Sequence, residues 1–256
     1  MAQKKWIVLS RILAIGAGLL AWELICRRGY VDPLFLVPPS EILQRTPLLL
    51  KEPEVHEAFA ITAYEIMAAF ALAAGIGIPL GLLIGLKNEA YELFNPVILV
   101  LFAVPQVTIY YLFVLWFGIG VTSKIAFGFT HGFFPILLNT LAGVRGVDRM
   151  LLRASRSMGA SRLQLFRKVV IPWTIPTLIT GLRLGMNFTL LGVFLAELVV
   201  SQKGLGARII VLTSSFETAS LYSLVGLICL LAILINESLR LLEKRLGQWR
   251  TEKVVI

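Results

Sequence analysis

Residues 153–161 read Arg-Ala-Ser-Arg-Ser-Met-Gly-Ala-Ser and lie at the centre of a basic, amphipathic segment in a chain that is otherwise mostly apolar. Apolar side chains recur in this segment at close to helical spacing, at Leu151, Ala154, Met158 and Leu165. Gly159 interrupts the run and lets two short helices meet at an angle. Pro172 ends the run and can occupy the first turn of a following helix. We therefore predict a polar elbow between two apolar segments. This elbow would form a surface that a cytoplasmic partner can contact.

The composition of the chain is that of a membrane protein. Of its 256 residues, 57% are apolar and 15% are charged, and the mean hydropathy is +0.84. A soluble domain needs more polar surface than this, whereas a helix needs about 20 apolar residues to cross a bilayer. Six apolar runs approach or exceed that length: 6–26, 58–86, 93–117, 122–143, 173–200 and 219–241. We predict an all-α, polytopic membrane helical bundle of about six transmembrane helices, with no room for a second folded domain.

The basic residues are distributed unevenly between these runs. The chain has 24 Lys and Arg residues and a net charge of +9. The amino-terminal segment and every second loop hold sixteen of these bases, the other loops hold seven, and Arg183 lies inside a span. Because cytoplasmic loops are enriched in Lys and Arg, this asymmetry places both termini and the 145–170 loop in the cytoplasm, although Arg27 and Arg28 run against it. The positive charge is thus a topology signal, and we expect no nucleic-acid partner.

The cysteines and the amino terminus predict ordinary membrane helices. Cys26 and Cys229 lie at or within apolar runs, which favours buried hydrophobic side chains over a disulfide or a metal site. The first 26 residues resemble a signal peptide, with Lys4 and Lys5 ahead of an apolar core, but no small-residue cleavage site follows. We predict an uncleaved first helix.

Two further patterns predict how helices begin and pack. Residues 37–42, Val-Pro-Pro-Ser-Glu-Ile, indicate an extended external stretch, and Ser40 is a candidate cap for a short helix that runs to about Leu50. Glycines recur four residues apart at 77, 81 and 85 and again at 181 and 185, a spacing that lets helix backbones approach closely. We favour packing within one subunit over a contact between two copies.

The basic segment resembles the EAA loop of permease subunits of ATP-binding-cassette importers. The family motif runs Glu-Ala-Ala, three residues, Gly, nine residues, Ile, one residue, Leu-Pro. Here Gly159 is followed by nine residues and then by Val169-Val170-Ile171-Pro172, so the spacing from Gly to Pro matches. Arg153 stands where the family usually has Glu. From its residues alone, the segment could instead lie on anionic lipid headgroups.

In that family the loop forms coupling helices that dock in a groove of the ATPase subunit. The resemblance therefore implies an ATPase-coupling surface, made of Arg153, Ala154, Ser155, Met158, Gly159, Ala160, Leu163, Val169, Ile171 and Pro172. The change from acid to base at Arg153 leaves the helix–Gly–helix geometry intact.

Other stretches resemble the sulfonate, taurine and nitrate branch of the same permeases, over roughly residues 35–245. They are residues 37–42, 115–124 and 133–144, with Gly181-Leu182-Arg183, Ala196-Glu197 and Gly204-Leu205-Gly206. The resemblance implies a type I ABC importer permease fold. It divides the chain into a first transmembrane helix with an external amphipathic segment at 1–57, a type-1 core at 58–241 containing the coupling loop 145–170, and a cytoplasmic tail at 242–256. Glu65 departs from the pattern, because these relatives usually place Arg there.

The resemblance also implies a function and partners. The chain would be a multi-pass permease of the bacterial cytoplasmic (inner) membrane that translocates a small anion such as a sulfonate, taurine or nitrate. Its partners would be a second permease copy in a homodimer, two ATPase subunits, a periplasmic or lipid-tethered binding protein, and membrane lipids. One alternative is the same fold serving a vitamin precursor or an aromatic carboxylate. Another is an ion-coupled secondary transporter, for which no inverted repeat or acid relay is evident.

The sequence carries no recognisable catalytic motif. No Gly-x-x-x-x-Gly-Lys-Ser/Thr occurs, so no phosphate-binding loop is encoded, and ATP and Mg²⁺ would bind to a separate ATPase chain. His56 and His131 lie far apart, with no Cys or carboxylate at metal-ligand spacing, and no Ser-His-Asp elbow is recognisable. We predict a non-catalytic subunit that binds no cofactor or metal of its own.

Polar residues within the apolar runs are candidates for the transport pathway or gate. These are His131, Asn139, Arg183, Asn187 and Glu197, with Thr189 as a further candidate. Arg183 and Glu197 share one run but are 14 residues apart, about 21 Å along a helix, so they cannot pair with each other. For His131, Arg183 and Glu197, packing or pairing with a neighbouring helix is the favoured alternative.

Overall fold

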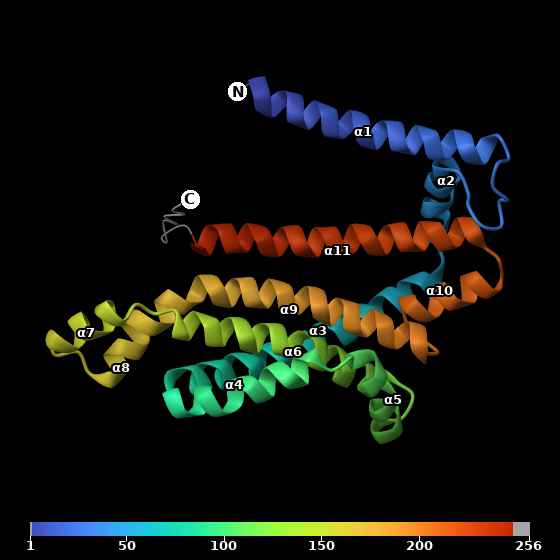
Figure 1. The fold of residues 1–256 in the computed structure, drawn as a ribbon. Helices are drawn as coiled ribbons and strands as arrows, with labels where there is room; N and C mark the ends of the chain where they lie inside the picture. Colours follow the sequence, from blue (N-terminus) through green and yellow to red (C-terminus); the bar gives the residue numbers. More distant parts are fainter. Residues whose placement is uncertain (1, 248–256) are drawn as a thin grey trace. The chain divides into compact units, whose positions relative to one another are not determined.

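The part of the chain that the structure describes consists of helices joined by turns and loops (Figure 1). This computed structural model describes residues 2–247, apart from the side chains of residues 2–5, 7–9, 12, 242 and 244–247. Within that range the elements are α-helices and one π-helical turn, with no strand. The predicted all-α fold is confirmed. The chain divides into two compact units, residues 1–60 with 203–230 and residues 61–202 with 231–256.

Four helices within the described range are long and apolar enough to cross a membrane. They are α3 (Pro53–Leu86), α6 (Val121–Arg145), the continuous helix Arg162–Val199 that contains α9 (Ile171–Val199), and α11 (Thr218–Gly247). A fifth span results if α4 (Asn88–Ala103) and α5 (Gln106–Phe117) are taken together. Each of these matches a predicted apolar run. The remaining run, 6–26, lies in α1 (Ala2–Arg27), a continuous helix of 26 residues, and its crossing of the membrane stays a prediction. Of the predicted tail, residues 242–247 continue α11, and residues 248–256 lie outside the described part of the chain.

The predicted span at 93–117 is not one straight helix. α4 and α5 are bent by 89° where they meet. Pro105 has no N–H to donate, and its ring pushes the preceding residue out of the helical region. Val104 accordingly has extended dihedral angles, with φ −64° and ψ 132°. The apolar length of 93–117 predicts a span but not this bend, which Pro105 introduces.

The first unit contains α1, α2 (Pro39–Leu49), α10 (Leu205–Ser214) and the beginnings of α3 and α11. The helix predicted after the first span is present, but Ser40 does not cap it: α2 follows Pro38 with no side-chain cap. The backbone N–H and the hydroxyl of Ser40 donate instead to the Glu23 carboxylate of α1, at 3.1 and 2.7 Å. Because Ser40 already lies inside the helix, its side chain joins α2 to α1 and does not cap the start of α2.

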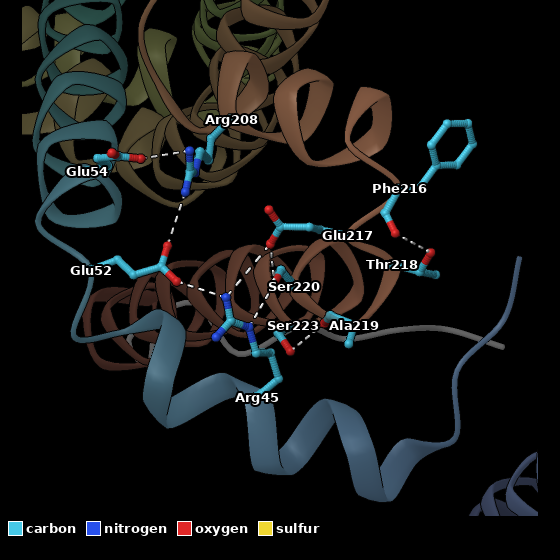
Figure 2. Close-up of polar contacts among 10 residues, drawn as sticks. All are labelled: Arg45, Glu52, Glu54, Arg208, Phe216, Glu217, Thr218, Ala219, Ser220 and Ser223. Carbon is cyan, nitrogen blue, oxygen red and sulfur yellow. Dashed lines mark hydrogen bonds and ion pairs between the residues drawn. The ribbon is translucent and has the colours of Figure 1, made fainter. Parts of the chain in front are cut away.

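Ion pairs and hydrogen bonds link the helices of the first unit (Figure 2). The Glu52 carboxylate accepts from Arg45 of α2 and from Arg208 of α10, at 3.0 and 3.1 Å. Arg208 also pairs with Glu54 at 2.7 Å, and Arg45 donates to the Ser220 hydroxyl of α11 at 2.8 Å. This network ties α2 and α10 to the beginnings of α3 and α11.

In the second unit, α6 packs closely against glycines of both α3 and α9. The three glycines of α3, at 77, 81 and 85, face α6 side chains that are also four residues apart: Ile136, Thr140 and Val144. A Cβ added to Gly81 would lie 2.6 Å from that of Thr140, and one added to Gly181 of α9 would lie 2.6 Å from that of Asn139. Only a residue without a side chain permits this approach. The favoured reading, packing within one subunit, accounts for both glycine series.

Candidate coupling surface and polar residues of the membrane core

The basic segment folds as a helical elbow, residues 149–165. Its first helix, α7 (Arg149–Ser157), begins at Asp148, whose carboxylate accepts from the backbone N–H of Met150 at 2.7 Å. The helix gives way to Gly159, which has a φ of +80°. Nothing lies within 4 Å of the place where a Cβ would stand there. The left-handed turn, rather than packing, therefore requires glycine at this position.

The second half of the elbow runs directly into the membrane core. α8 (Arg162–Leu165) begins with a capping box at Ser161. It continues through a π-helical turn, η1 (Phe166–Val170), into α9, so that Arg162–Val199 forms one helix of 38 residues. Pro172 occupies the first turn of α9, as predicted, but it does not end the segment. The wider π turn just before it accommodates a residue with no N–H to donate, so the chain stays helical.

The predicted coupling residues fall into two groups by exposure. The exposed group comprises Arg153, Ala154, Met158, Gly159 and Leu163, with Met158 80% and Leu163 63% exposed. The buried or half-buried group comprises Ser155, Ala160, Val169, Ile171 and Pro172. In the buried group, Val169 packs against a hydrophobic cluster formed by Val144, Val147 and Val170. The exposed group is therefore the part of the elbow that a partner can contact, and its exposed apolar side chains suit a hydrophobic groove.

Two of the candidate pathway residues are held within α6 itself. His131 is buried, with Nδ1 3.1 Å from the Phe127 carbonyl oxygen and its ring 4.4 Å from the Phe127 ring. Gly192 of α9 leaves room for the imidazole, because a Cβ there would lie 2.7 Å from its Cγ. The Asn139 amide donates back to the Pro135 carbonyl at 2.8 Å. These contacts favour packing roles for both side chains. Thr189, the further candidate, is also fully buried where α9 meets α6.

Two other candidates connect α9 to α11. Arg183 Nε lies 3.3 Å from one carboxylate oxygen of Glu243, and the other oxygen accepts from the Thr180 hydroxyl at 2.7 Å. The Asn187 amide donates to the Asn236 side chain at 3.3 Å. A base within a span needs a partner or water, and Glu243 gives Arg183 such a partner on the neighbouring helix.

Glu197 belongs to a buried ion cluster at the end of the unit opposite to the elbow. Lys124 of α6 pairs with Glu65 of α3, and its Nζ lies 3.8 Å from Glu197 of α9. Glu197 also accepts from the Thr62 hydroxyl at 2.6 Å. None of the three charged side chains is more than 2% exposed. The cluster therefore joins three spans, and Glu197 is engaged within it.

Comparison with known proteins identifies the family of the chain. Residues 77–248 match the family described as binding-protein-dependent transport system inner membrane component. The chain belongs to this family. The resemblance to permeases of ATP-binding-cassette importers is thereby confirmed, and the protein is an integral membrane permease.

Individual relatives agree with this assignment. The taurine transport system permease protein TauC of Escherichia coli is 32% identical and is aligned over 95% of this permease and 92% of its own length. The aliphatic sulfonates transport permease protein SsuC of Bacillus subtilis is 31% identical, over 90% of this permease and 83% of its own length. The formylaminopyrimidine transport permease protein ThiX of Halalkalibacterium halodurans is 29% identical, over 91% and 92%. Among solved structures, a chain of the MetNI methionine ABC transporter in an inward-facing conformation shares the fold, with a TM-score of 0.67, 17% identity, and coverage of 75% of this permease and 96% of that chain.

Lys124 of the permease was not predicted as part of a site. The charge asymmetry assigns this residue to an external loop, whereas the structure places it in the first turn of α6 at 2% exposure. A signal for it was present, because Glu65 and Glu197 are acids in two different apolar runs and need a cation. Lys124 is a base at the edge of a third run. The position where relatives usually place Arg carries Glu65 here, and the cation of the cluster comes from α6.

Proposed function

We propose that this permease forms the membrane pathway of an ATP-driven importer and couples to separate ATPase subunits through its elbow. The observation that carries the proposal is the pair of exposed apolar side chains, Met158 and Leu163, on either side of the Gly159 turn. ATP and Mg²⁺ would bind to the ATPase chains, and the permease would perform no covalent chemistry.

The continuous helix from α8 to α9 supplies a mechanical route for coupling. A displacement of the elbow at Leu163 would pass along one helix to Arg183, Asn187 and Glu197, without an intervening loop. In the proposed cycle, ATP binding draws the two elbows of a homodimer together and opens the pathway to the outside. A periplasmic or lipid-tethered binding protein delivers the solute, and hydrolysis restores the inward-facing state. Two copies around a twofold axis would enclose the pathway.

The proposed substrate is a small anion of the sulfonate or taurine class. The support is the identity of about a third with the taurine and aliphatic sulfonate permeases over nearly the whole chain. A second candidate, a pyrimidine vitamin precursor, is supported by the similarity to the formylaminopyrimidine permease. We expect uptake of labelled taurine or an alkanesulfonate into proteoliposomes containing the permease, its ATPase and its binding protein, only when ATP is present on the ATPase side. Uptake of formylaminopyrimidine, without uptake of taurine or an alkanesulfonate, would support the second candidate. ATP-independent uptake driven by an ion gradient would contradict the proposal of an ATP-driven importer.

The proposed orientation places both termini and the elbow in the cytoplasm of a bacterial cell, with the permease in its cytoplasmic membrane. The support is the ratio of sixteen bases to seven between alternate loops. A cysteine at Ser157 should react only with membrane-permeant reagents, and one at Gln202 should react from outside. Gln248, a second cytoplasmic test position, lies outside the described residues. Labelling of Ser157→Cys from outside in intact cells would contradict this orientation.

A further inference from the structure

A cavity of about 770 Å³ opens beside the elbow in the second unit. Its wall combines the turn between α3 and α4 with the end of α6, α7 and the beginning of α8. Six bases line it: Lys87, Arg145, Arg149, Arg153, Arg156 and Arg162. Glu89 is the single acid among the described residues of the wall. The cavity is therefore strongly positive.

No ion pair within the described part of the chain neutralises these bases. Among the ion pairs between described residues, none involves any of the six. Arg145 is oriented by neutral groups, since it donates to the Asn88 side chain at 2.5 Å and lies over the Tyr91 ring at 4.5 Å. Like charges gathered around one cavity repel each other, and a bound anion relieves that repulsion.

The location of the cavity at the ends of two apolar spans favours an anion that belongs to the membrane. The apolar span α3 ends at Leu86 and α6 ends at Arg145, so the wall lies where two spans leave the apolar region. Apolar side chains, among them Leu86, Val144 and Leu152, share the wall with the bases. A basic pocket between helices at the cytoplasmic surface is suited to the headgroup of an anionic lipid.

The cavity is also distinct from the apolar contact face of the elbow. Met158 and Leu163, and likewise Met150 at 76% exposure, do not line it. A protein groove can therefore receive these side chains while the cavity holds a different ligand. Of the exposed coupling residues only Arg153 lines the cavity, and this near-separation favours a lipid over an acidic protein segment as the occupant.

We propose that this cavity binds the phosphodiester headgroup of an anionic phospholipid of the cytoplasmic leaflet, and that the headgroup bridges α7 to the turn between α3 and α4. The leaflet rests on the proposed orientation of the permease, whereas the lipid site itself does not. The headgroup would then fix the elbow at the membrane surface while its apolar face stays free.

Native mass spectrometry of the purified, full-length permease tests the site by titration with cardiolipin, phosphatidylglycerol or phosphatidylcholine. The test variant is Lys87→Gln/Arg149→Gln, which removes two bases of the wall and no predicted coupling residue. The matched control is Arg167→Gln/Lys168→Gln, which removes two exposed bases of η1 outside the wall. We expect the wild type and the control to prefer the anionic lipids over phosphatidylcholine. The test variant should bind them about thirtyfold more weakly, given about 1 kcal/mol for each base near the surface.

Other outcomes would overturn the proposal. If the wild type bound phosphatidylcholine as tightly as the anionic lipids, the proposal would fail. This test needs no variant, so it holds even if the test variant does not fold. Equal weakening by the two double variants would show general surface charge and not a site. Displacement of the lipid by millimolar inorganic phosphate would identify a soluble anion as the ligand. Loss of ATPase copurification in the test variant, with lipid binding unchanged, would assign the bases to an acidic protein partner.

Discussion

The two ends of the second unit treat charge in opposite ways. At one end, Lys124 is buried between Glu65 and Glu197, and every charge has a partner within the protein. At the other, six bases surround an open cavity, and among the described ion pairs none involves them. Buried charges must be paired because desolvation is costly. Exposed charges are solvated by water, so they need no partner within the protein and remain available to a ligand. The first end is built for holding helices together, and the second for contact with something outside the chain.

Removing the buried cation should have the largest effect. Lys124→Met leaves two carboxylates without their base in a site that excludes water, and the loss of one partner of a buried pair costs about 3–5 kcal/mol. The matched control is Lys203→Met, which breaks a pair with Glu57 whose side chains are 68% and 60% exposed, and this should cost less than about 1 kcal/mol. The measurement is the thermal unfolding of the detergent-purified permease. Adding Glu65→Leu to Lys124→Met should recover part of the loss, and equal losses for Lys124→Met and Lys203→Met would abolish the distinction between buried and exposed pairing.

A second prediction concerns the packing that runs between the two ends. Gly81→Ala places a Cβ 2.6 Å from that of Thr140, so α3 and α6 must separate, and such overpacking costs about 1–3 kcal/mol. Gly75→Ala, on the same helix, meets nothing within 4 Å and should be neutral or stabilise the helix by up to about 1 kcal/mol. The unfolding temperature should therefore fall for Gly81→Ala, and for Gly75→Ala it should stay the same or rise. A loss of stability in Gly75→Ala as large as in Gly81→Ala would contradict the close approach of α3 to α6.

The parts that could be predicted from the sequence are those set by neighbours along the chain. Apolar runs gave the spans, the glycine at 159 gave the turn, and glycines four residues apart gave the close helix packing. The bend between α4 and α5 was also locally encoded, in Pro105, but its signal is weaker than that of a long apolar run.

What could not be predicted depends on residues that are distant in the sequence. The partners of Glu65 and Arg183 are Lys124 and Glu243, each about 60 residues away. No periodicity connects such residues, because helix packing alone decides which spans become neighbours. Five of the six bases of the cavity lie close together in the 145–170 loop, and the fold adds Lys87, which is 58 residues before Arg145.

The third prediction tests whether the elbow acts through its turn. Gly159→Val should strain a backbone with φ +80° by about 1–2 kcal/mol, leaving the permease inserted but uncoupled from the ATPase. The matched control is Gly29→Val, because Gly29 also has a positive φ, +71°, and open space around it, but lies in the first unit. Copurification of the ATPase and ATP-driven uptake should fall for Gly159→Val alone, and Gly159→Asn should retain more of both, since Asn tolerates this conformation. Normal transport by Gly159→Val would remove the turn from the coupling mechanism.

The smallest effect is expected at Arg183, which lies between the two extremes of the comparison. Its pair with Glu243 is neither buried nor open, with side chains 27% and 25% exposed, so breaking it should cost about 1 kcal/mol, near the upper limit for exposed pairs. If the pair is structural, Arg183→Gln, Glu243→Gln and the double variant should all lose a similar amount of assembled complex, because the second change removes nothing further. Arg183→Lys should also lose some, since it keeps the charge but not the planar fork. Uptake per assembled complex should stay at the wild-type level in all four variants.

If Arg183 instead attracts an anionic substrate, Arg183→Gln should assemble fully and lose uptake, while Arg183→Lys and Glu243→Gln retain it. That result would move Arg183 from the group of charges that hold helices together to the group that meets a ligand.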